Sequence, residues 1–265
     1  MGVTVECEHL TKSYGDLIAV NDVSFRVDEG EIFGLVGPNG AGKTTIIKML
    51  TTLLPPASGQ ATVGGFSITR CATDVRRIIG YVPQMLSADA TLTGYENLWV
   101  FARLYDVPRV EREPRVRSAL AFMGLADAAN RLVRTYSGGM IRRLEIAQSI
   151  LHRPRVLFLD EPTIGLDPLA RKAVWGYILE LCTNYGTTIF MTTHMMEEAD
   201  SLCQRVAIMH HGRIVAIGTP ADLKAAIGEG VTLEDVFIHY TGDKLDSGDS
   251  YRETARVRRT AKRLN

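Results

Sequence analysis

The pattern of apolar positions changes along the first part of the chain. Residues 3–10 and 21–27 have the pattern of two short strands, and residues 14–16 form an expected turn between them, so the chain should open with antiparallel β structure. Residues 31–36 are more uniformly apolar, which is typical of a buried strand. A Gly-rich turn then leads into an expected helix over residues 43–54.

The same strand-then-helix pattern recurs later in the chain. Residues 156–160 precede an expected helix over 168–184, and residues 187–193 precede a shorter helix. Such alternation predicts an α/β fold. The stretch 93–151 has helical periodicity and few strand signals, and residues 205–217 resemble a β-hairpin, so a helical block is expected to interrupt the α/β pattern.

The composition is that of a globular protein whose charges cancel. The 265 residues include 30 basic and 30 acidic side chains, so charge gives no reason to expect nucleic acid as a partner. No stretch is apolar and long enough to span a bilayer, and another chain would have to supply any membrane-spanning segments. The cysteines form no CxxC pair, which favours a reducing cytosol and argues against a zinc site. They are Cys7, Cys71, Cys182 and Cys203.

The last segment, residues 241–265, is polar, and basic side chains predominate near its end. Arg252, Arg256, Arg259 and Arg263 are spaced by three or four residues, so a helix would place them on one face. Two interpretations stay open. The segment is either a solvated end or a basic face that contacts anionic lipid headgroups or an acidic partner.

A glycine-rich motif lies between the strand expected at 31–36 and the helix after it. The pattern G-x-x-x-x-G-K-[ST] of a phosphate-binding loop is matched by Gly37, Pro38, Asn39, Gly40, Ala41, Gly42, Lys43 and Thr44. Its glycines let backbone N–H groups converge on phosphate oxygens. Lys43 is expected to reach the β- and γ-phosphates of ATP and Thr44 to bind Mg²⁺, with Thr45 beside them. A Gly-rich turn of a dinucleotide fold, the alternative, would not need the Lys-Thr pair.

A pair of acids lies at the end of the apolar strand 156–160. In a phosphate-loop fold a carboxylate at this place holds Mg²⁺ opposite the Ser or Thr hydroxyl, and Asp160 has this place. Glu161 points to the other side, where it can act as a general base toward an attacking water. An Asp-Glu pair alone is often only a solvated turn. The complete phosphate loop upstream favours the functional interpretation.

A second glycine-rich helix start precedes that strand, at Tyr136, Ser137, Gly138, Gly139 and Met140. It resembles the signature sequence of ABC-transporter ATPases, and the resemblance covers about residues 3–240, with the motifs in the family's order. Tyr14 lies where the family places an aromatic that stacks on adenine. Gln84 matches the Q-loop, from which it is expected to reach Mg²⁺ or the attacking water. Asp167 lies in a sequence like the D-loop, and His194 matches the switch histidine that contacts the γ-phosphate.

The resemblance implies a fold as well as an activity. The expected architecture is a phosphate-loop (RecA-like) α/β core with an N-terminal antiparallel β subdomain and an inserted α-helical subdomain. Residues 1–240 would form the ATP-binding domain, 85–151 its helical signature subdomain, and 241–265 a basic tail.

The signature also has a physical meaning of its own. Ser137 as an N-cap, followed by glycines, makes a second anion-binding helix N-terminus in one chain. Two such ends suggest that two copies meet head to tail, as the family does. Each ATP would then lie between Lys43 of one copy and Ser137 and Gly139 of the other.

Two departures narrow the resemblance to one branch. Tyr136 and Met140 replace the common Leu and Gln, and with the residues after His194 they resemble the daunorubicin-resistance-type exporters. That branch pairs its ATPases with separate transmembrane permease chains and exports drugs, lipids or polysaccharides. The resemblance therefore implies a peripheral protein at the cytoplasmic face of the membrane.

The helical block would carry the contact with the permease. Leu98 and Ala102 are expected to pack inside the block, whereas Trp99 and Tyr105 are candidates for a groove that accepts a short helix of the partner. A soluble ABC ATPase acting on nucleic acid or ribosomes is the competing function, but it would have a duplicated cassette or a long heptad insertion, and the sequence has neither. A phosphate-loop kinase would not use the signature.

Overall fold

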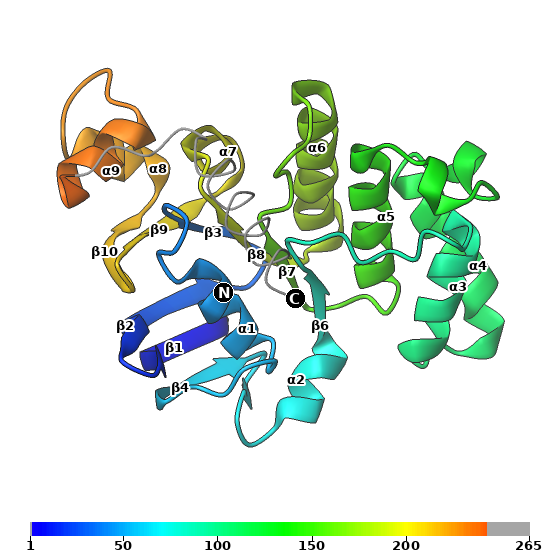
Figure 1. Ribbon diagram of the computed structural model, residues 1–265, viewed down its shortest axis with the longest axis horizontal. Helices are drawn as coiled ribbons and strands as arrows, with labels where there is room; N and C mark the ends of the chain where they lie inside the picture. The colour runs from blue at the N-terminus through cyan, green and yellow to red at the C-terminus, as the bar shows by residue number, and fades with distance from the viewer. Residues whose placement is uncertain (1, 243–265) are drawn as a thin grey trace, which may run out of the picture.

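The computed structural model describes residues 2–242, so the basic side chains predicted to form one face of the tail lie outside the described residues. These residues form two β-sheets and a set of helices (Figure 1). The helices are α1 Lys43–Leu50, α2 Ala72–Ile78, α3 Gly94–Leu104, α4 Arg109–Phe122, α5 Gly138–Ile150, α6 Pro168–Tyr185, α7 Met196–Leu202, α8 Pro220–Ala225 and α9 Leu233–Thr241, with 3-10 turns at Ala126–Ala128 and Val133–Thr135.

The N-terminal sheet is antiparallel and has the strand order β2-β1-β4-β5. Its strands are β1 Val3–Tyr14, β2 Leu17–Asp28, β4 Ser58–Val63 and β5 Phe66–Ser67. On β2, Val23, Phe25 and Val27 are buried while the residues between them are exposed, as in a sheet with one face in solvent. The antiparallel opening is therefore confirmed, with longer strands than the sequence pattern indicated.

The second sheet has the strand order β10-β9-β3-β8-β7-β6. Its strands are β3 Ile32–Val36, β6 Ile79–Val82, β7 Val156–Asp160, β8 Thr188–Thr193, β9 Arg205–His210 and β10 Arg213–Gly218. The strands from β9 to β6 are parallel, and β10 pairs antiparallel with β9 as the expected hairpin. Every residue of β3, β7 and β8 is buried because other layers cover both faces.

Two apolar layers cover the two faces of this second sheet. On one face, phenylalanines join it to the N-terminal sheet: the ring centroids of Phe25 and Phe33, and of Phe33 and Phe190, lie 5.5 Å apart. On the other face, side chains such as Leu157 pack with Ile178 of α6 and its neighbouring helices. The sheet is thereby a rigid support whose carboxyl ends carry the loops of the site.

Helices α3, α4 and α5 lie together at the end of the molecule away from β10 (Figure 1). Helix α3 begins with a capping box, in which Thr93 and Glu96 each accept a hydrogen bond from the other's backbone N–H. Leu98 and Ala102 of α3 are fully buried, as predicted. The helical block is therefore present, and its buried side chains belong to the same apolar cluster as Leu157 and Ile178.

The structure differs from the sequence pattern in several short elements. Strands β4 and β5 and helices α2, α8 and α9 were not predicted. Helix α1 ends at Leu50, short of the expected Leu54, and Thr52 takes a positive φ of 62° just before Pro55 and Pro56. Proline restricts the residue before it to extended conformations, so the helix has to end ahead of this pair.

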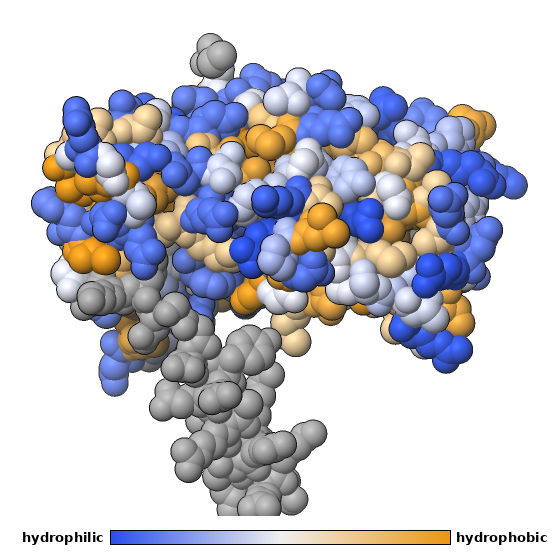
Figure 2. All heavy atoms as spheres, turned by 90° about the horizontal axis from the view of Figure 1, so that it is seen from above, coloured by the Kyte–Doolittle hydropathy of each residue, from blue (hydrophilic) through white to orange (hydrophobic). Residues whose placement is uncertain are grey.

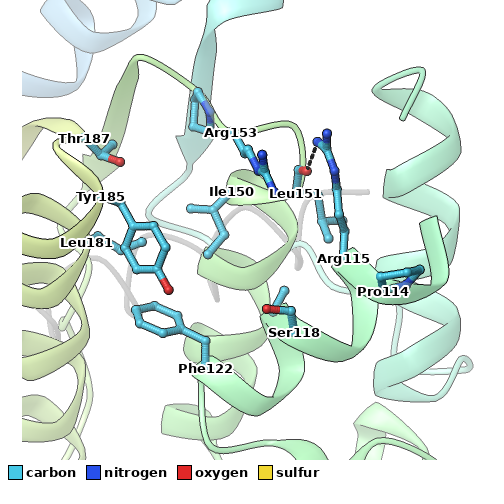
Figure 3. A pocket seen from close by; sticks show the side chains of 12 residues that line it. Pro114, Arg115, Ser118, Phe122, Ile150, Leu151, Arg153, Leu181, Tyr185 and Thr187 are labelled. Atoms are coloured by element: carbon cyan, nitrogen blue, oxygen red, sulfur yellow. Dashed lines mark hydrogen bonds between the residues drawn. The ribbon is translucent and has the colours of Figure 1, made fainter. Parts of the chain in front are cut away.

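A cavity of about 540 Å³ lies where α4, the end of α5 and the end of α6 meet (Figure 3). Its lining includes Arg115, Phe122, Arg153 and Tyr185, and Arg115 donates to the carbonyl oxygen of Leu151 at 2.9 Å. None of its lining residues is a predicted site residue. The predicted chemistry lies elsewhere in the fold.

The surface of the described residues mixes apolar and polar side chains on the face shown in Figure 2. Large apolar side chains that are exposed belong to several different elements, and they include Tyr14, Met85, Leu104 and Leu169. Within residues 2–242, no helix combines the length and the apolar character needed to cross a bilayer.

Candidate active site

The predicted phosphate loop, residues 37–42, joins β3 to the N-terminus of α1. Gly42 has a φ of 106°, and a Cβ there would lie 2.3 Å from the carbonyl oxygen of Ala19. A Cβ on Gly37 would lie 2.2 Å from the carbonyl oxygen of Met209. The loop therefore passes so close to the backbones of β2 and β9 that both positions require glycine.

The middle of the loop is a tight turn that is open at its tip. The N–H of Ala41 donates to the carbonyl oxygen of Pro38 at 3.2 Å, and the Ala41 carbonyl accepts from the N–H of Gly212 at 3.1 Å. Asn39 and Gly40 are exposed at the tip. The β9–β10 turn thus holds the loop through the Gly212 N–H, and the tip of the loop faces solvent.

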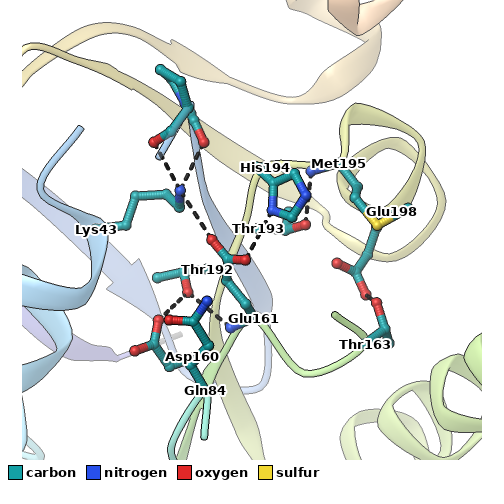
Figure 4. Close-up of polar contacts among 12 residues, drawn as sticks. Lys43, Gln84, Asp160, Glu161, Thr163, Thr192, Thr193, His194, Met195 and Glu198 are labelled. Carbon is teal, nitrogen blue, oxygen red and sulfur yellow. Dashed lines mark hydrogen bonds and ion pairs between the residues drawn. The ribbon is translucent and has the colours of Figure 1, made fainter. Parts of the chain in front are cut away.

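Lys43 is the first residue of α1, and its side chain is 5% exposed. Its Nζ donates to the carbonyl oxygens of Gly37 at 2.7 Å and Pro38 at 3.1 Å, and it lies 3.2 Å from Oε1 of Glu161 (Figure 4). Burial lowers the pKa of Lys43, although the neighbouring Glu161 carboxylate opposes this shift. The ammonium group thus lies between the phosphate loop and the carboxylate that follows β7.

Asp160 ends β7, and its carboxylate points to α1. Its Oδ1 accepts hydrogen bonds from Thr44 Oγ1 at 3.1 Å and from Thr192 Oγ1 at 2.6 Å. Burial raises the pKa of Asp160, while the two hydroxyl groups and Lys43 oppose the rise.

The donor atoms around Asp160 decide which metal would fit. A carboxylate and a hydroxyl side by side are hard oxygen donors, which suit Mg²⁺ held by one or two protein groups together with phosphate and water. Among residues 2–242 no cluster of three or more His, Cys, Asp or Glu side chains could hold a metal by itself. Thr44 and Asp160 therefore fit Mg²⁺ better than a transition metal.

Glu161 follows β7 in a left-handed backbone conformation with a φ of 49°. Its N–H donates to Thr192 Oγ1 at 3.0 Å and to the Thr192 carbonyl at 3.1 Å, which holds this strained residue. The two carboxylate oxygens have different partners: Oε1 faces Lys43, and Oε2 lies 2.9 Å from His194 Nδ1. Burial acts to raise the pKa of Glu161, but the His194 hydrogen bond and the Lys43 charge together outweigh it, and the pKa lies below its usual value.

Gln84 lies two residues after β6, the strand next to β7. Figure 4 shows its side chain beside Asp160, and its backbone carbonyl accepts from Arg142 Nη2 at 2.8 Å. The structure thus brings one group of predicted site residues together at the carboxyl ends of the parallel strands. That group is Lys43, Thr44, Gln84, Asp160, Glu161 and His194.

The predicted signature residues lie in another part of the molecule. Ser137 is the N-cap of α5, and its Oγ accepts from the N–H of Met140 at 3.3 Å. Ser137 and Gly138 are exposed, whereas a Cβ on Gly139 would lie 2.8 Å from the Cβ of Ala170 on α6. Gly139 therefore lets α5 and α6 approach closely. In Figure 1, α5 lies next to α3 and α4, whereas α1, which follows the phosphate loop, lies beside the N-terminal sheet.

Three further predicted residues remain, at the start of α6, at the end of β1 and within α1. Asp167 caps α6, with its Oδ1 accepting from the N–H groups of Leu169 and Ala170, both at 3.0 Å. Tyr14 ends β1 with its side chain 48% exposed. Thr45 lies on α1 and is half-buried.

The family to which these motifs belong follows from comparison with known proteins. A family described as ABC transporter matches residues 20–164, a span that includes the phosphate loop, the signature and both acids at the end of β7. This chain belongs to the ABC transporter family.

Several similar ABC proteins have names that refer to resistance or export. The daunorubicin/doxorubicin resistance ATP-binding protein DrrA of Streptomyces peucetius is 44% identical over 227 residues, covering 86% of this chain and 68% of that protein. The linearmycin resistance ATP-binding protein LnrL of Bacillus subtilis is 39% identical, covering 84% and 72%. The Nod factor export ATP-binding protein I of Cupriavidus pinatubonensis is 41% identical, covering 92% and 73%.

The fold agrees with that of solved ABC proteins. The structure of an ATP-binding subunit of an ABC transporter superposes with a TM-score of 0.80 at 31% identity, covering 90% of this chain and 99% of that one. The predicted α/β fold is thereby confirmed. The chain is an ATP-hydrolysing, nucleotide-binding subunit of the ABC transporter family.

In this ABC ATPase, residues that the sequence analysis did not single out also bond to the acids of the site and to one another. Thr192 bonds the Asp160 carboxylate and the Glu161 N–H, and its signal was the pair of hydroxyl residues Thr192 and Thr193 directly before His194. Thr163 Oγ1 and Trp175 Nε1 both donate to Glu198 Oε1, at 2.7 and 2.9 Å. Glu198 is 1% exposed on α7, and an acidic residue on a short helix had given no sign of burial.

Proposed function

We propose that two copies of this ABC ATPase enclose two ATP molecules and that hydrolysis drives a separate membrane permease. The observation that carries the proposal is the place of Glu161. Its buried carboxylate lies between Lys43 and His194, next to the Thr44–Asp160 pair. A base, a cation and two hard oxygen donors are the groups that phosphoryl transfer to water requires.

The phosphate loop and Lys43 would bind the phosphates of ATP through backbone N–H groups and the ammonium charge. Thr44 and Asp160 would hold Mg²⁺, with Gln84 beside them, and the ion would neutralise charge on the β- and γ-phosphate oxygens. Tyr14, exposed at the end of β1, would stack on the adenine. These assignments separate phosphate binding, metal binding and adenine stacking among the predicted residues.

Glu161 is the proposed general base. The low pKa of its carboxyl keeps it ionised at neutral pH, and a phosphate group that attracts Lys43 leaves Oε1 to accept a proton from water. His194 holds Oε2 and thereby the orientation of the carboxylate. The bonds from the Glu161 N–H to Thr192 prevent the backbone from relaxing out of this position.

The signature residues are proposed to act on the ATP of the second copy. Ser137, Gly138 and Gly139 stand at the N-terminus of the 13-residue helix α5, where the free N–H groups and the helix dipole favour an anion. Ser137 and Gly138 are exposed, as such a role requires. Leu169, close to Asp167, is 81% exposed and is an apolar side chain that a second copy would cover.

The permease is proposed to dock beside Gln84. The predicted contacts Trp99 and Tyr105 are half-buried, because Trp99 stacks on Tyr95 and Tyr105 stacks on His152. More exposed apolar side chains lie on α3 itself and in the segment directly after Gln84. These are Met85 at 74%, Leu86 at 52%, Val100 at 42% and Leu104 at 69% exposure. A short helix of a membrane chain would bury them.

The cargo is proposed from the names of the relatives. Daunorubicin, doxorubicin and linearmycin resistance and Nod factor export belong to those proteins. For this chain they support export of drugs, lipids or other amphipathic compounds, from a site at the cytoplasmic face of the membrane. No nucleic acid is expected as a partner.

Reconstitution tests this function. The chain would be co-expressed with a membrane protein encoded beside it, one with about six apolar spanning segments, and the pair placed in lipid vesicles with daunorubicin as probe. We expect co-purification and probe movement that requires ATP and stops with Glu161→Gln. Co-purification with ribosomes or nucleic acid in place of a membrane protein would contradict the proposal.

A further inference from the structure

Helix α5 carries three polar side chains on one buried face. Arg142, Glu145 and Gln148 follow one another at intervals of three residues and are 2%, 3% and 2% exposed. Buried charges destabilise a fold unless an opposite charge and hydrogen bonds compensate them. This face of α5 must therefore lie against polar groups at a defined position.

Those polar groups belong to residues 83–89, the first part of the connection from β6 to α3. The segment has no regular structure, so its backbone groups depend on side chains for hydrogen bonds. Arg142 donates from Nη1 to the Pro83 carbonyl at 2.7 Å and from Nη2 to the Gln84 carbonyl at 2.8 Å. The planar guanidinium fixes two successive carbonyl groups at once, which a single ammonium group does not reproduce.

Glu145 holds the other end of the same segment. Its Oε1 accepts from the N–H groups of Ser87 and Ala88 and, at 3.2 Å, from the Ser87 hydroxyl. Its Oε2 lies 3.1 Å from Arg142 Nη1. The two charges neutralise each other inside the fold, and each one fixes one end of the segment.

Gln148, the third polar side chain on this face of α5, contacts the same segment through Asn97. Its Nε2 donates to Asn97 Oδ1 at 3.3 Å, and the Asn97 side chain bonds both the N–H and the carbonyl of Asp89. Between the fixed ends, Met85 and Leu86 are 74% and 52% exposed. The segment therefore presents apolar side chains to the outside and its backbone to α5.

Each end of this linkage carries residues with a proposed role in ATP hydrolysis. Gln84 carries its side chain beside Asp160, and its carbonyl is bonded to Arg142 (Figure 4). The same helix α5 begins at the signature residues, after the N-cap Ser137. A displacement of residues 83–89 would thus be passed to α5 without a flexible element between them.

We propose that Arg142 and Glu145 are positioning residues for ATP hydrolysis, which fix Gln84 beside Asp160 and make residues 83–88 move with the signature helix as one unit. The inference rests on the proposed function, because it requires Gln84 to act at the metal site.

The substitution Arg142→Lys tests the linkage and keeps a cation beside Glu145. We expect a kcat lower by about 10-fold, an unchanged affinity for ATP without Mg²⁺, and a higher Mg²⁺ concentration for half-maximal turnover. Arg143→Lys is the matched control, because Arg143 is next on the helix but donates to the Met123 carbonyl. Its turnover and Mg²⁺ dependence should equal those of the unchanged protein.

A double-mutant cycle separates positioning from a general structural effect. In a Gln84→Ala background, Arg142→Lys should lower turnover by less than about twofold, because Gln84 is no longer there to be positioned. A full further loss in that background overturns the proposal, as do unchanged kcat and Mg²⁺ dependence in Arg142→Lys, or unchanged turnover in Gln84→Ala.

A second variant covers the case in which Arg142→Lys does not fold. Glu145→Gln keeps an oxygen acceptor for Ser87 and Ala88 and removes the charge that orients Arg142. Glu145→Gln should lower turnover in the unchanged protein but by less than about twofold in the Gln84→Ala background. An equal loss of turnover in both backgrounds would overturn the proposal here too. Failure of the proposed function would show separately, as undiminished turnover in Glu161→Gln.

Discussion

Two regions of the chain carry the family's motifs, and they differ in how far their side chains are buried and bonded to one another. Around Glu161 the side chains are buried and bonded to one another: Lys43 is 5% exposed, Asp160 1% and Glu161 5%. At Ser137 and Asp167 the side chains are exposed, and their hydrogen bonds go to the N–H groups of the helix that each one caps.

The difference indicates what each region needs in order to work. The buried group is preorganised, so little rearrangement is required when charge develops during reaction. The capped helix starts satisfy one or two of their own N–H groups and present the others to an anion from outside. The first region would perform the chemistry, and the second would supply half of a site that another copy completes.

Glu161→Gln should produce the largest effect. Loss of the general base is expected to slow turnover by roughly 10²–10⁴-fold while ATP binding persists, and ATP should then trap a dimer. Steady-state ATPase assays and size-exclusion chromatography with ATP measure both. Glu197→Gln, an exposed acid at the start of α7, is the control and should leave turnover unchanged. Near-normal turnover in the Glu161 variant would remove its assigned role.

A pair of substitutions contrasts the two regions directly. Lys43→Ala should weaken ATP binding and lower turnover by roughly 10²-fold, whereas Ser137→Arg should lower turnover by a similar factor and leave ATP binding by the monomer intact. Equilibrium binding of a fluorescent ATP analogue distinguishes them. If Ser137→Arg weakens monomer binding as much as Lys43→Ala, the two regions belong to one site in one chain.

Thr192→Val should have an intermediate effect. It removes the hydroxyl that bonds Asp160 Oδ1 and the Glu161 N–H, so we expect turnover to fall by about 10-fold with a weaker response to Mg²⁺. Thr192→Ser restores the hydroxyl and should recover most of the activity. No recovery in the serine variant would mean that the methyl group, and not the hydrogen bonds, is what matters.

Mild acidification should give the smallest effect and should separate the two acids. Burial raises the pKa of Asp160, so a falling pH protonates this carboxyl earlier than an ordinary aspartate, whereas the pKa of Glu161 is lowered. Mg²⁺ competes with that proton. We expect turnover to fall by about twofold at the Asp160 pKa, with a midpoint that moves to lower pH as Mg²⁺ is raised. A midpoint independent of Mg²⁺ would assign the acid limb to another group.

The sequence predicted those parts of the fold in which apolar spacing follows burial. Strands β3 and β7 are buried along their whole length and therefore appear as nearly continuous apolar runs. Strand β4 was missed because Ser58, Gly59 and Gln60 are exposed and polar, so its first half shows no alternation. Helix α2 buries only Val75 and has no apolar stripe.

For the site residues too, the sequence alone did not show which polar side chains would be buried. Lys43 and Asp160 were predicted because their motifs dictate their chemistry, whatever surrounds them. Arg142 and Glu145 could not be predicted, because charged residues on a helix normally face solvent, and their burial depends on backbone groups of residues 83–88 far away in the sequence. A linear pattern does not record which irregular segment will need hydrogen-bond partners.

The most direct measurement of the composite site is a cross-link between two differently tagged copies. One copy carries Asn39→Cys and the other Ser137→Cys, both with Cys71→Ser and Glu161→Gln; the other native cysteines, Cys7, Cys182 and Cys203, are buried. With ATP and Mg²⁺ we predict a disulfide that joins the two tags. A chain carrying both new cysteines should likewise link to a second copy. A disulfide that closes within one chain, or no link between tags when ATP is bound, would contradict the head-to-tail arrangement.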